Sequence, residues 1–176
     1  MKKLVKISLV LVAMIAFGAT SYAQHSASAS SKAIVIAPIA IQKNLDLDFG
    51  NIIADGTGGT VSVAADAVGT RTASPLTLIS SAQAGTVQSA KFTITGQDGF
   101  TYTITLPQTD VTLVGPAGSN DMTIDHTTFL SSIASPATFS GSSAVLYVGA
   151  TLAVGADQDA GTYNSTSDFT ITVDYQ

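Results

Sequence analysis

Residues 146–176, LYVGATLAVGADQDAGTYNSTSDFTITVDYQ, indicate the fold most directly. They predict two β-strands joined by a turn-rich loop. In the second strand apolar and polar side chains alternate: one face carries Phe169, Ile171, Val173 and Tyr175, and the other carries Thr170, Thr172 and Asp174. A period of two with β-branched and aromatic residues is typical of a half-buried strand. We therefore expect residues 169–175 to form one wall of a β-sheet protein.

Similar short segments recur through the chain. The remaining predicted strands are residues 33–41 (interrupted by Pro38), 45–49, 60–63, 76–79, 91–95, 101–106, 111–114, 122–124 and 145–154. The Gly/Asp loop at residues 96–99 predicts a hairpin between its two flanking strands. Residues 129–142 are expected to be irregular, and Gly149 to mark a bulge or a close approach of two backbones.

The spacing of these strands predicts the fold class. They follow one another about every 10 residues, and no amphipathic helical period follows the first 23 residues. The chain also uses aspartate, which favours turns, and no glutamate, which favours helices. We expect an all-β protein, a single antiparallel β-sandwich of immunoglobulin-like character over residues 33–176, with a β-barrel as the alternative.

The N-terminus predicts export. Lys2, Lys3 and Lys6 precede an apolar run at residues 9–17, and small residues at Ser21 and Ala23 favour cleavage after Ala23. The apolar run is shorter than the roughly 20 residues that a membrane-spanning helix needs. We expect a signal peptide at residues 1–23, a polar linker at residues 24–32 and no membrane span after cleavage. The protein is then extracytoplasmic: secreted, at the cell surface or periplasmic.

Composition excludes several classes of function. After residue 23 the chain has four Lys and Arg residues against twelve Asp, a formal net charge of −8 (4 − 12). This charge disfavours nucleic acids, which need a basic surface, and anionic membranes. Cysteine is absent, so disulfides, thiol catalysis and thiolate metal sites are excluded.

A set of short motifs occurs in a characteristic order. It comprises Pro38-Ile39, Leu47-Asp48-Phe49-Gly50, Gly59-Thr60-Val61, residues 92–96 (FTITG), residues 101–107 (TYTITLP), residues 147–152 (YVGATL) and Ala160-Gly161-Thr162-Tyr163. The set resembles the bacterial exported family called domain of unknown function 4402, over nearly all of the chain after the signal. That family has no established activity, so the resemblance implies a fold and not a chemistry.

A more distant resemblance is to spore coat protein U and the pilins of archaic chaperone–usher systems. It is carried by the Leu-Asp-Phe-Gly segment, by a Gly-Thr-Tyr loop before the last strand, by the penultimate Tyr175 and by Gly161 fourteen residues earlier. It implies an incomplete sandwich that is filled by a neighbour's N-terminal strand. This chain lacks the usual disulfide. Its residues 25–31 are polar and too short to donate a strand, and residues 33–41 could donate only if the domain lost its own first strand.

No set of residues predicts an enzyme. His126 is the only histidine outside the linker, and in an extended segment the adjacent Asp125 would point to the opposite face. Asp46 and Asp48 would lie on one strand face about 7 Å apart. Both would face solvent, which is unlike the carboxylate pair of a glycosidase. We assign no catalytic, cofactor-binding or metal-binding residue and expect no cofactor.

Calcium is the ion that the loops would suit best, because it takes carboxylate and carbonyl oxygens. The candidate segments are residues 157–159 and 120–125, neither of which follows the EF-hand spacing. Since aspartate is also a common turn residue, the presence of a structural calcium ion is left open.

Two further motifs predict no function. Asn164-Ser165-Thr166 fits a glycosylation sequon by chance. Residues 56–59 predict a turn without a phosphate site.

The sequence therefore predicts an exported, non-enzymatic structural protein of the bacterial cell surface. It would be a pilus-like or coat subunit that assembles through β-strand edges, with a second copy of itself or a periplasmic chaperone as partner. The alternative is a monomeric extracytoplasmic module that binds a ligand or a carbohydrate. Such a site normally presents exposed aromatic residues, of which Tyr163, in a loop, is the main candidate.

Overall fold

The computed structural model describes residues 25–176, so the predicted signal peptide lies outside the described residues. The chain divides into a unit up to Val35 and a unit formed by Ile36–Gln176. Residues 25–39 form no helix or strand. In residues 25–176 there is no helix of the length and hydrophobicity that a membrane crossing requires.

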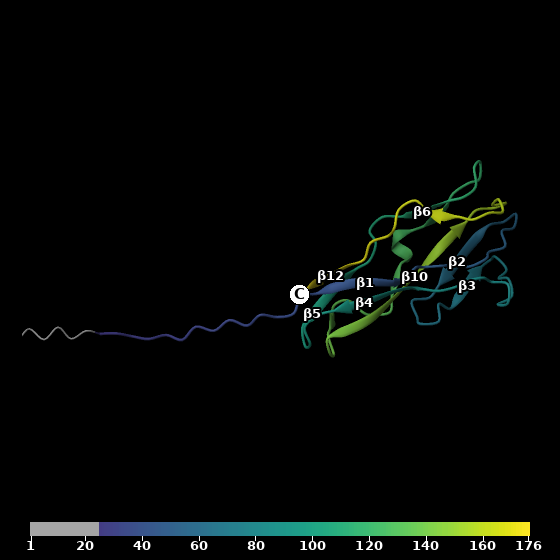
Figure 1. Cartoon of the computed structure of the whole chain (residues 1–176). Helices are drawn as coiled ribbons and strands as arrows, with labels where there is room; N and C mark the ends of the chain where they lie inside the picture. The colour runs from purple at the N-terminus through teal and green to yellow at the C-terminus, as the bar shows by residue number, and fades with distance from the viewer. Residues whose placement is uncertain (1–24) are drawn as a thin grey trace, which may run out of the picture. The chain divides into compact units, whose positions relative to one another are not determined.

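The second unit is all-β, as predicted, and all its strand pairs are antiparallel (Figure 1). One short 3-10 helix, η1 (His126–Thr128), interrupts the strands. The strands are β1 (Ala40–Leu45), β2 (Gly59–Val63), β3 (Arg71–Ser74), β4 (Ala90–Thr95), β5 (Thr101–Thr105), β6 (Val111–Val114), β7 (Met122–Ile124), β8 (Leu130–Ser131), β9 (Ala137–Thr138), β10 (Ser143–Val154), β11 (Asn164–Ser165) and β12 (Thr172–Tyr175).

Nine of these strands form one strongly curled sheet, a half-barrel. Its main order is β1-β4-β10-β7-β6-β11, while β2 and β8 also pair with β10, and β3 pairs with β2. The twelve residues of β10 make this possible, because its first half pairs with β4 and its second half with β2. Gly149 lies between the two halves, where a Cβ atom would collide with the backbone of Val63 and Ala64. The predicted close approach at Gly149 is confirmed.

A small second sheet contains β12, β5 and β9 in that order. The alternation predicted for the last strand is confirmed. Ile171 and Val173 are buried, while the intervening threonines and Asp174 are exposed. The strand itself is shorter than predicted, since its pairing with β5 begins only at Thr172.

The predicted hairpin is wrong. β4 pairs with β1 and β10 in the large sheet, whereas β5 pairs with β12 and β9 in the small one. The loop between them is held by a third segment: the N–H of Gly99 donates to the carbonyl of Phe139 (3.1 Å), and the N–H of Gly141 donates to the carboxylate of Asp98 (2.7 Å). The chain therefore crosses from one sheet to the other at this loop.

Three further strand predictions need correction. Residues 76–79 form no strand, although Leu76 is buried; the strand in this region is β3, five residues earlier. The predicted strands at residues 33–41 and 45–49 are replaced by the single strand β1, beyond which Asp48 forms one isolated bridge with Gln88. Pro38 explains the late start of β1, because proline has no N–H for the sheet.

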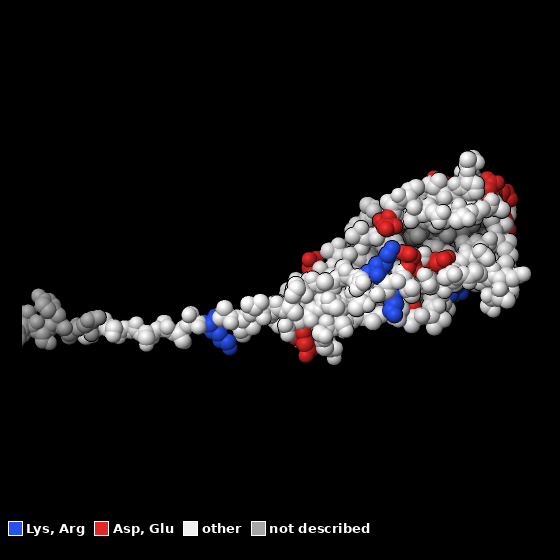
Figure 2. Space-filling view, viewed as in Figure 1, with Lys and Arg blue, Asp and Glu red and all other residues white. Residues whose placement is uncertain are grey.

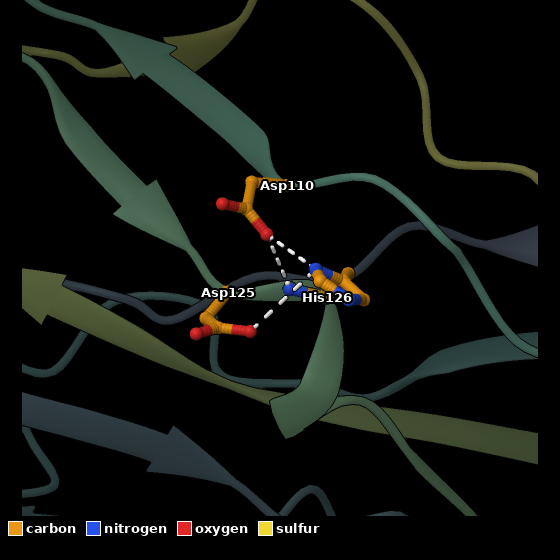
Figure 3. A group of neighbouring side chains, drawn as sticks. All are labelled: Asp110, Asp125 and His126. Carbon is orange, nitrogen blue, oxygen red and sulfur yellow. Dashed lines mark hydrogen bonds and ion pairs between the residues drawn. The ribbon is translucent and has the colours of Figure 1, made fainter.

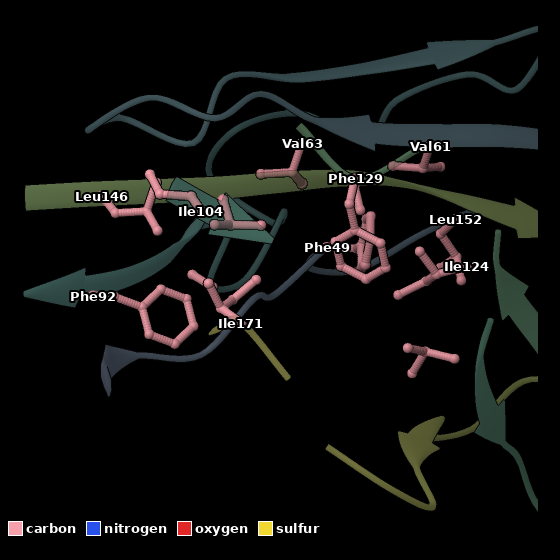
Figure 4. Close-up of a cluster of buried hydrophobic side chains, with 14 of the residues drawn as sticks. Phe49, Val61, Val63, Phe92, Ile104, Ile124, Phe129, Leu146, Leu152 and Ile171 are labelled. Carbon is pink, nitrogen blue, oxygen red and sulfur yellow. The ribbon is translucent and has the colours of Figure 1, made fainter. Parts of the chain in front are cut away.

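The two sheets share one apolar core (Figure 4). Phe92 and Ile94 of β4 and Tyr102 and Ile104 of β5 all belong to this core, although the two strands lie in different sheets. Several core side chains are almost completely shielded from water, and burying each aliphatic one contributes about 1.5–3 kcal/mol. The most deeply buried large side chains are Tyr102, Ile94, Leu146, Leu152, Val61, Val63 and Val148.

Candidate functional site

A groove of about 1250 Å³ lies on the concave side of the curled sheet. Figure 2 looks onto a hollowed face of the molecule with charged side chains beside the hollow. The floor of the groove consists of inward-facing side chains of four strands, β4, β10, β7 and β6. They include Phe92, Leu152, Val154, Met122, Ile124, Val111 and Leu113.

One wall of the groove is the irregular segment of residues 46–54, which follows β1. Arg71 on β3 holds this segment: its guanidinium donates two 2.8 Å hydrogen bonds, to the carbonyls of Phe49 and Asn51. The Asp48 carboxylate accepts a hydrogen bond from the N–H of Gly50 (2.8 Å), and the positive φ of Gly50, +70°, turns the chain there. The wall is therefore fixed without being part of a sheet.

The opposite wall comprises residues 158–165 and 168–171. Tyr163, predicted in a loop, does lie in one, but it is half-buried and its hydroxyl donates to the carbonyl of Asp159 (2.8 Å). The Gln158 amide donates to the same hydroxyl (3.0 Å). A Cβ at Gly115 would collide with the Tyr163 ring, so the ring packs directly on the chain that follows β6. Tyr163 therefore braces this wall and is not an exposed binding aromatic.

The rim of the groove is acidic. It includes one cation, Lys43, and four carboxylates, those of Asp46, Asp48, Asp159 and Asp168. Lys43 forms a 2.6 Å ion pair with Asp46, and this hydrogen bond raises the pKa of Lys43. The pair is exposed to solvent, so it contributes little to stability. The formal charge of the rim is −3 (1 − 4), which would attract a cationic group.

Two strand edges flank the groove. β1 pairs only with β4, and β11 only with β6, so the main order of the large sheet ends at these two strands among residues 25–176. β12 likewise pairs only with β5 in the small sheet. The outer side of an edge strand presents backbone N–H and C=O groups that can pair with an additional strand.

A second cluster lies outside the groove (Figure 3). Asp125 and His126 do not point to opposite faces, as predicted, because the segment is not extended: Asp125 caps η1 by accepting from the N–H of Thr127 (2.8 Å). The carboxylate of Asp110 lies 2.7 Å from Nδ1 of His126 and also accepts from its backbone N–H (2.9 Å). The Asp125 carboxylate is 3.7 Å from the same ring nitrogen.

These hydrogen bonds lower two pKa values. The pKa of Asp110 falls chiefly because the backbone and ring N–H groups of His126 stabilise its carboxylate. The pKa of Asp125 falls chiefly because of the hydroxyl and backbone N–H of Thr127. Two carboxylates and an imidazole within 4.8 Å of one another could contact a divalent cation. All three side chains are open to solvent, and capping and ring hydrogen bonds already account for their positions.

The other residues considered from the sequence are not brought together. Asp46 is paired with Lys43 and Asp48 binds its own turn, so they do not form a catalytic pair. Asp157 has a positive φ of 51°, and its N–H donates to the carbonyl of Asp55 (3.0 Å). Residues 56–57 form the predicted turn, where the Asp55 carboxylate accepts from Thr57 and Gly58. Asn164 and Ser165 form β11.

Comparison with known proteins gives one result. Residues 39–175 match the family described as Domain of unknown function (DUF4402). The match begins one residue before β1 and ends with the last residue of β12, so it covers every strand. Neither the curated proteins nor the solved structures contain a significant match to the chain.

Proposed function

The chain belongs to the family described as Domain of unknown function (DUF4402), and we propose that it is an exported, non-enzymatic structural protein that assembles at the bacterial cell surface through β-strand edges. The main support is the groove, which has an apolar floor and is flanked by the edge strands β1 and β11. A strand laid there would bury the apolar floor and pair with free backbone groups at the same time. This is the chemistry of β-augmentation.

The edges support this proposal because they are weakly protected. Natural edge strands are usually blocked by charges, proline or bulges. β11 carries only Asn164 and Ser165, and the single charge on β12 is Asp174. β1 does contain Lys43, but its ammonium group is held by Asp46. A partner strand would therefore meet few uncompensated charges at these edges.

We also propose that the two sheets are the faces of an immunoglobulin-like sandwich. Two antiparallel sheets with a common core support this interpretation. In that view the groove corresponds to the position of a strand that the chain itself does not supply. A periplasmic chaperone is then a second candidate partner, because it could cover the groove before assembly.

The first experiment is immunogold electron microscopy of native cells with antibody raised to residues 25–176. Gold along filaments or over a continuous coat is the expected result. Sedimentation velocity of the purified chain complements it and should show oligomers that persist on dilution. Label confined to the periplasm, together with a monomer at all concentrations, would contradict assembly.

A monomeric binding module is the second candidate, and the volume of the groove favours it. Pockets for small ligands commonly measure 300–1,000 Å³ and are mostly apolar, and this groove is of that size or larger. Its floor suits an apolar ligand better than a sugar, because Phe100 is the only aromatic residue among the exposed large hydrophobic residues of the described chain. Native mass spectrometry of protein isolated from its own cell envelope would detect such a ligand on a monomer.

A further inference from the structure

We infer that the groove binds a single-chain cationic amphiphile, with the apolar chain on the floor and an ammonium head between the two acidic walls. The inference rests on the binding-module candidate of the proposed function, since it names the class of ligand that such a module would take. Three features of the groove support it: the position of its charges, the aromatic rings beside them and the extent of its apolar floor.

The carboxylates of the rim stand on both walls of the groove. Asp46 and Asp48 belong to the wall of residues 46–54, whereas Asp159 and Asp168 belong to the opposite wall. Figure 2 shows acidic side chains above and below the hollow. Carboxylates on opposite walls repel each other, and a cation placed between them removes this repulsion. An uncharged ligand would leave the repulsion in place, and an anionic ligand would increase it.

Lys43 does not neutralise the rim. Its ammonium group forms a 2.6 Å ion pair with Asp46. The hydrogen bond from Lys43 to Asp46 is the main reason that the pKa of Lys43 is raised, and the charge of Asp168 raises this pKa further. Asp168 therefore lies within electrostatic range of Lys43, so the two walls approach each other at this end of the groove. The formal charge of −3 (1 − 4) remains for a cationic ligand.

The rim is not arranged for a metal ion. Such a site needs several ligand atoms that converge on one point. Among residues 25–176, the one group of three His or Asp side chains with ligand atoms within 4.8 Å of one another is Asp110, Asp125 and His126, outside the groove. The rim carboxylates are spread more widely. They therefore suit an organic cation, which is larger than a metal ion and is also held by apolar contacts.

Phenyl rings lie beside the acidic end of the groove. Phe169, which directly follows Asp168, is half-buried, and its ring centroid lies 6.5 Å from that of Phe92. Phe92 is in turn the β4 partner of Lys43 in the large sheet. Both rings line the groove. Aromatic rings attract alkylammonium groups, so the head of the ligand would meet rings as well as carboxylates at this end.

The floor provides the site for the apolar chain. Its side chains include those of Leu113, Met122 and Ile124. Leu113 is only half-buried, so part of the floor is in contact with solvent. The volume of about 1250 Å³ exceeds the usual range of small-ligand pockets, which leaves space for a long chain. Each methylene group that moves from water to this floor favours binding, because apolar surface is removed from water.

Three matched probes test the inference. The chain is produced with its complete N-terminus in a bacterial host and is titrated calorimetrically with dodecylammonium, dodecanoate and dodecyl maltoside, each below its micelle concentration. The head groups of these probes differ in charge. We expect one dodecylammonium per monomer, bound at least tenfold more tightly than either of the other probes. Raising the ionic strength should weaken the binding of dodecylammonium, because salt screens exposed charges.

Four variants assign the binding to the groove. Asp159→Asn and Asp168→Asn should each weaken the binding of dodecylammonium about threefold or more, and neither should change the binding of dodecyl maltoside. Asp174→Asn removes the same charge from the exposed face of β12, outside the groove, and should change neither affinity. Leu113→Ala makes the floor smaller and should weaken every probe that binds. All four side chains are exposed or half-buried, so these changes do not open a cavity in the core.

The outcomes separate this inference from the proposed function. Equal affinity for the three probes would overturn the cationic class and leave a groove that takes any single-chain amphiphile. Equal losses in Asp168→Asn and Asp174→Asn would overturn the site, because the overall charge would then explain the attraction. A monomer that binds no probe would overturn both the inference and the binding-module candidate. An oligomer that binds no probe, identified by sedimentation velocity, would overturn the inference and leave assembly through strand edges in place.

Discussion

The hydroxyl of Tyr175 donates a 2.8 Å hydrogen bond to the carbonyl oxygen of Ala37, a residue 138 positions earlier in the chain. The same hydroxyl accepts a 2.6 Å hydrogen bond from the backbone N–H of Gln97, whose side-chain oxygen accepts from the N–H of Ala37. This ring of three hydrogen bonds joins the last strand of the small sheet to the segment just before β1 of the large sheet.

Replacing Tyr175 by Phe should therefore destabilise the fold. The substitution leaves the N–H of Gln97 and the carbonyl of Ala37 without their partner, a loss of about 1–2 kcal/mol in the free energy of unfolding. Urea denaturation measures it. Tyr147→Phe is the matched control, because Tyr147 lies on the outer face of β10. An equal loss in both variants would show that the Tyr175 hydroxyl has no special role.

Gly149→Ala should destabilise the half-barrel strongly. The added Cβ would collide with backbone atoms of Val63 and Ala64, which cannot move aside without separating β10 from β2. Overpacking against backbone typically costs about 1–3 kcal/mol or more. Gly56→Ala is the control, since its Cβ would meet only the Asp157 side chain at an ordinary 3.5 Å. Thermal melts of both variants test the prediction, which a stable Gly149→Ala protein would refute.

The contribution of Asp110 to stability should depend on pH. Hydrogen bonds from His126 lower the pKa of Asp110 in the folded state. Its unfolded pKa is about 3.9, so the stabilisation is complete well above pH 4 and is lost as the pH falls through the folded pKa. Asp110→Asn should therefore be less stable than the original chain at pH 7, and the gap should close on acidification.

Urea titrations at a series of pH values between 7 and 2.5 measure this gap. Asp174→Asn, on the exposed face of β12, serves as the control for loss of one negative charge. A gap that stays constant or widens as the pH falls would contradict the assignment of the effect to the Asp110 carboxylate.

Deleting residues 168–176 should abolish cooperative folding, and not merely assembly. The deletion removes β12, the buried side chains of Ile171 and Val173, and the Tyr175 hydrogen bonds. It also leaves one edge of β5 unpaired in the middle of the fold. Circular dichroism and a thermal melt decide the question. A truncated chain that is soluble, monomeric and melts cooperatively would disprove the prediction.

Local patterns were sufficient for the strands whose side chains alternate. Residues 169–175 have the predicted faces because the burial of alternate side chains is a property of the segment alone. Pairing is not local, and the false hairpin shows why. A Gly/Asp loop between two alternating strands favours a tight turn, yet contacts of Asp98 and Gly99 with a segment 40 residues later carry β5 into the other sheet.

The candidate site was harder to predict. Two of its strands, β6 and β7, were correctly predicted, but the groove exists only because the sheet curls and its two ends stay apart. The sequence predicts a strand over residues 33–41, which include the apolar run of residues 33–36. The structure starts β1 at Ala40 and leaves that run outside the sheet. Likewise, Asp110 and His126 meet through a turn that the sequence pattern did not reveal.

The twelve residues of β10 have a consequence for how this protein is made. Strands β2, β4, β7 and β8 all pair with β10, which is encoded after every one of them. As the chain emerges N-terminus first, the pairs β1–β4, β2–β3 and β6–β7 can form, but they cannot be joined into one sheet until β10 has appeared. Folding dominated by such distant pairings is slow, and the waiting strands are exposed to aggregation. The yield of folded protein should therefore depend on chaperones that keep the unfinished chain soluble in the compartment where it emerges. Slower synthesis should not raise that yield.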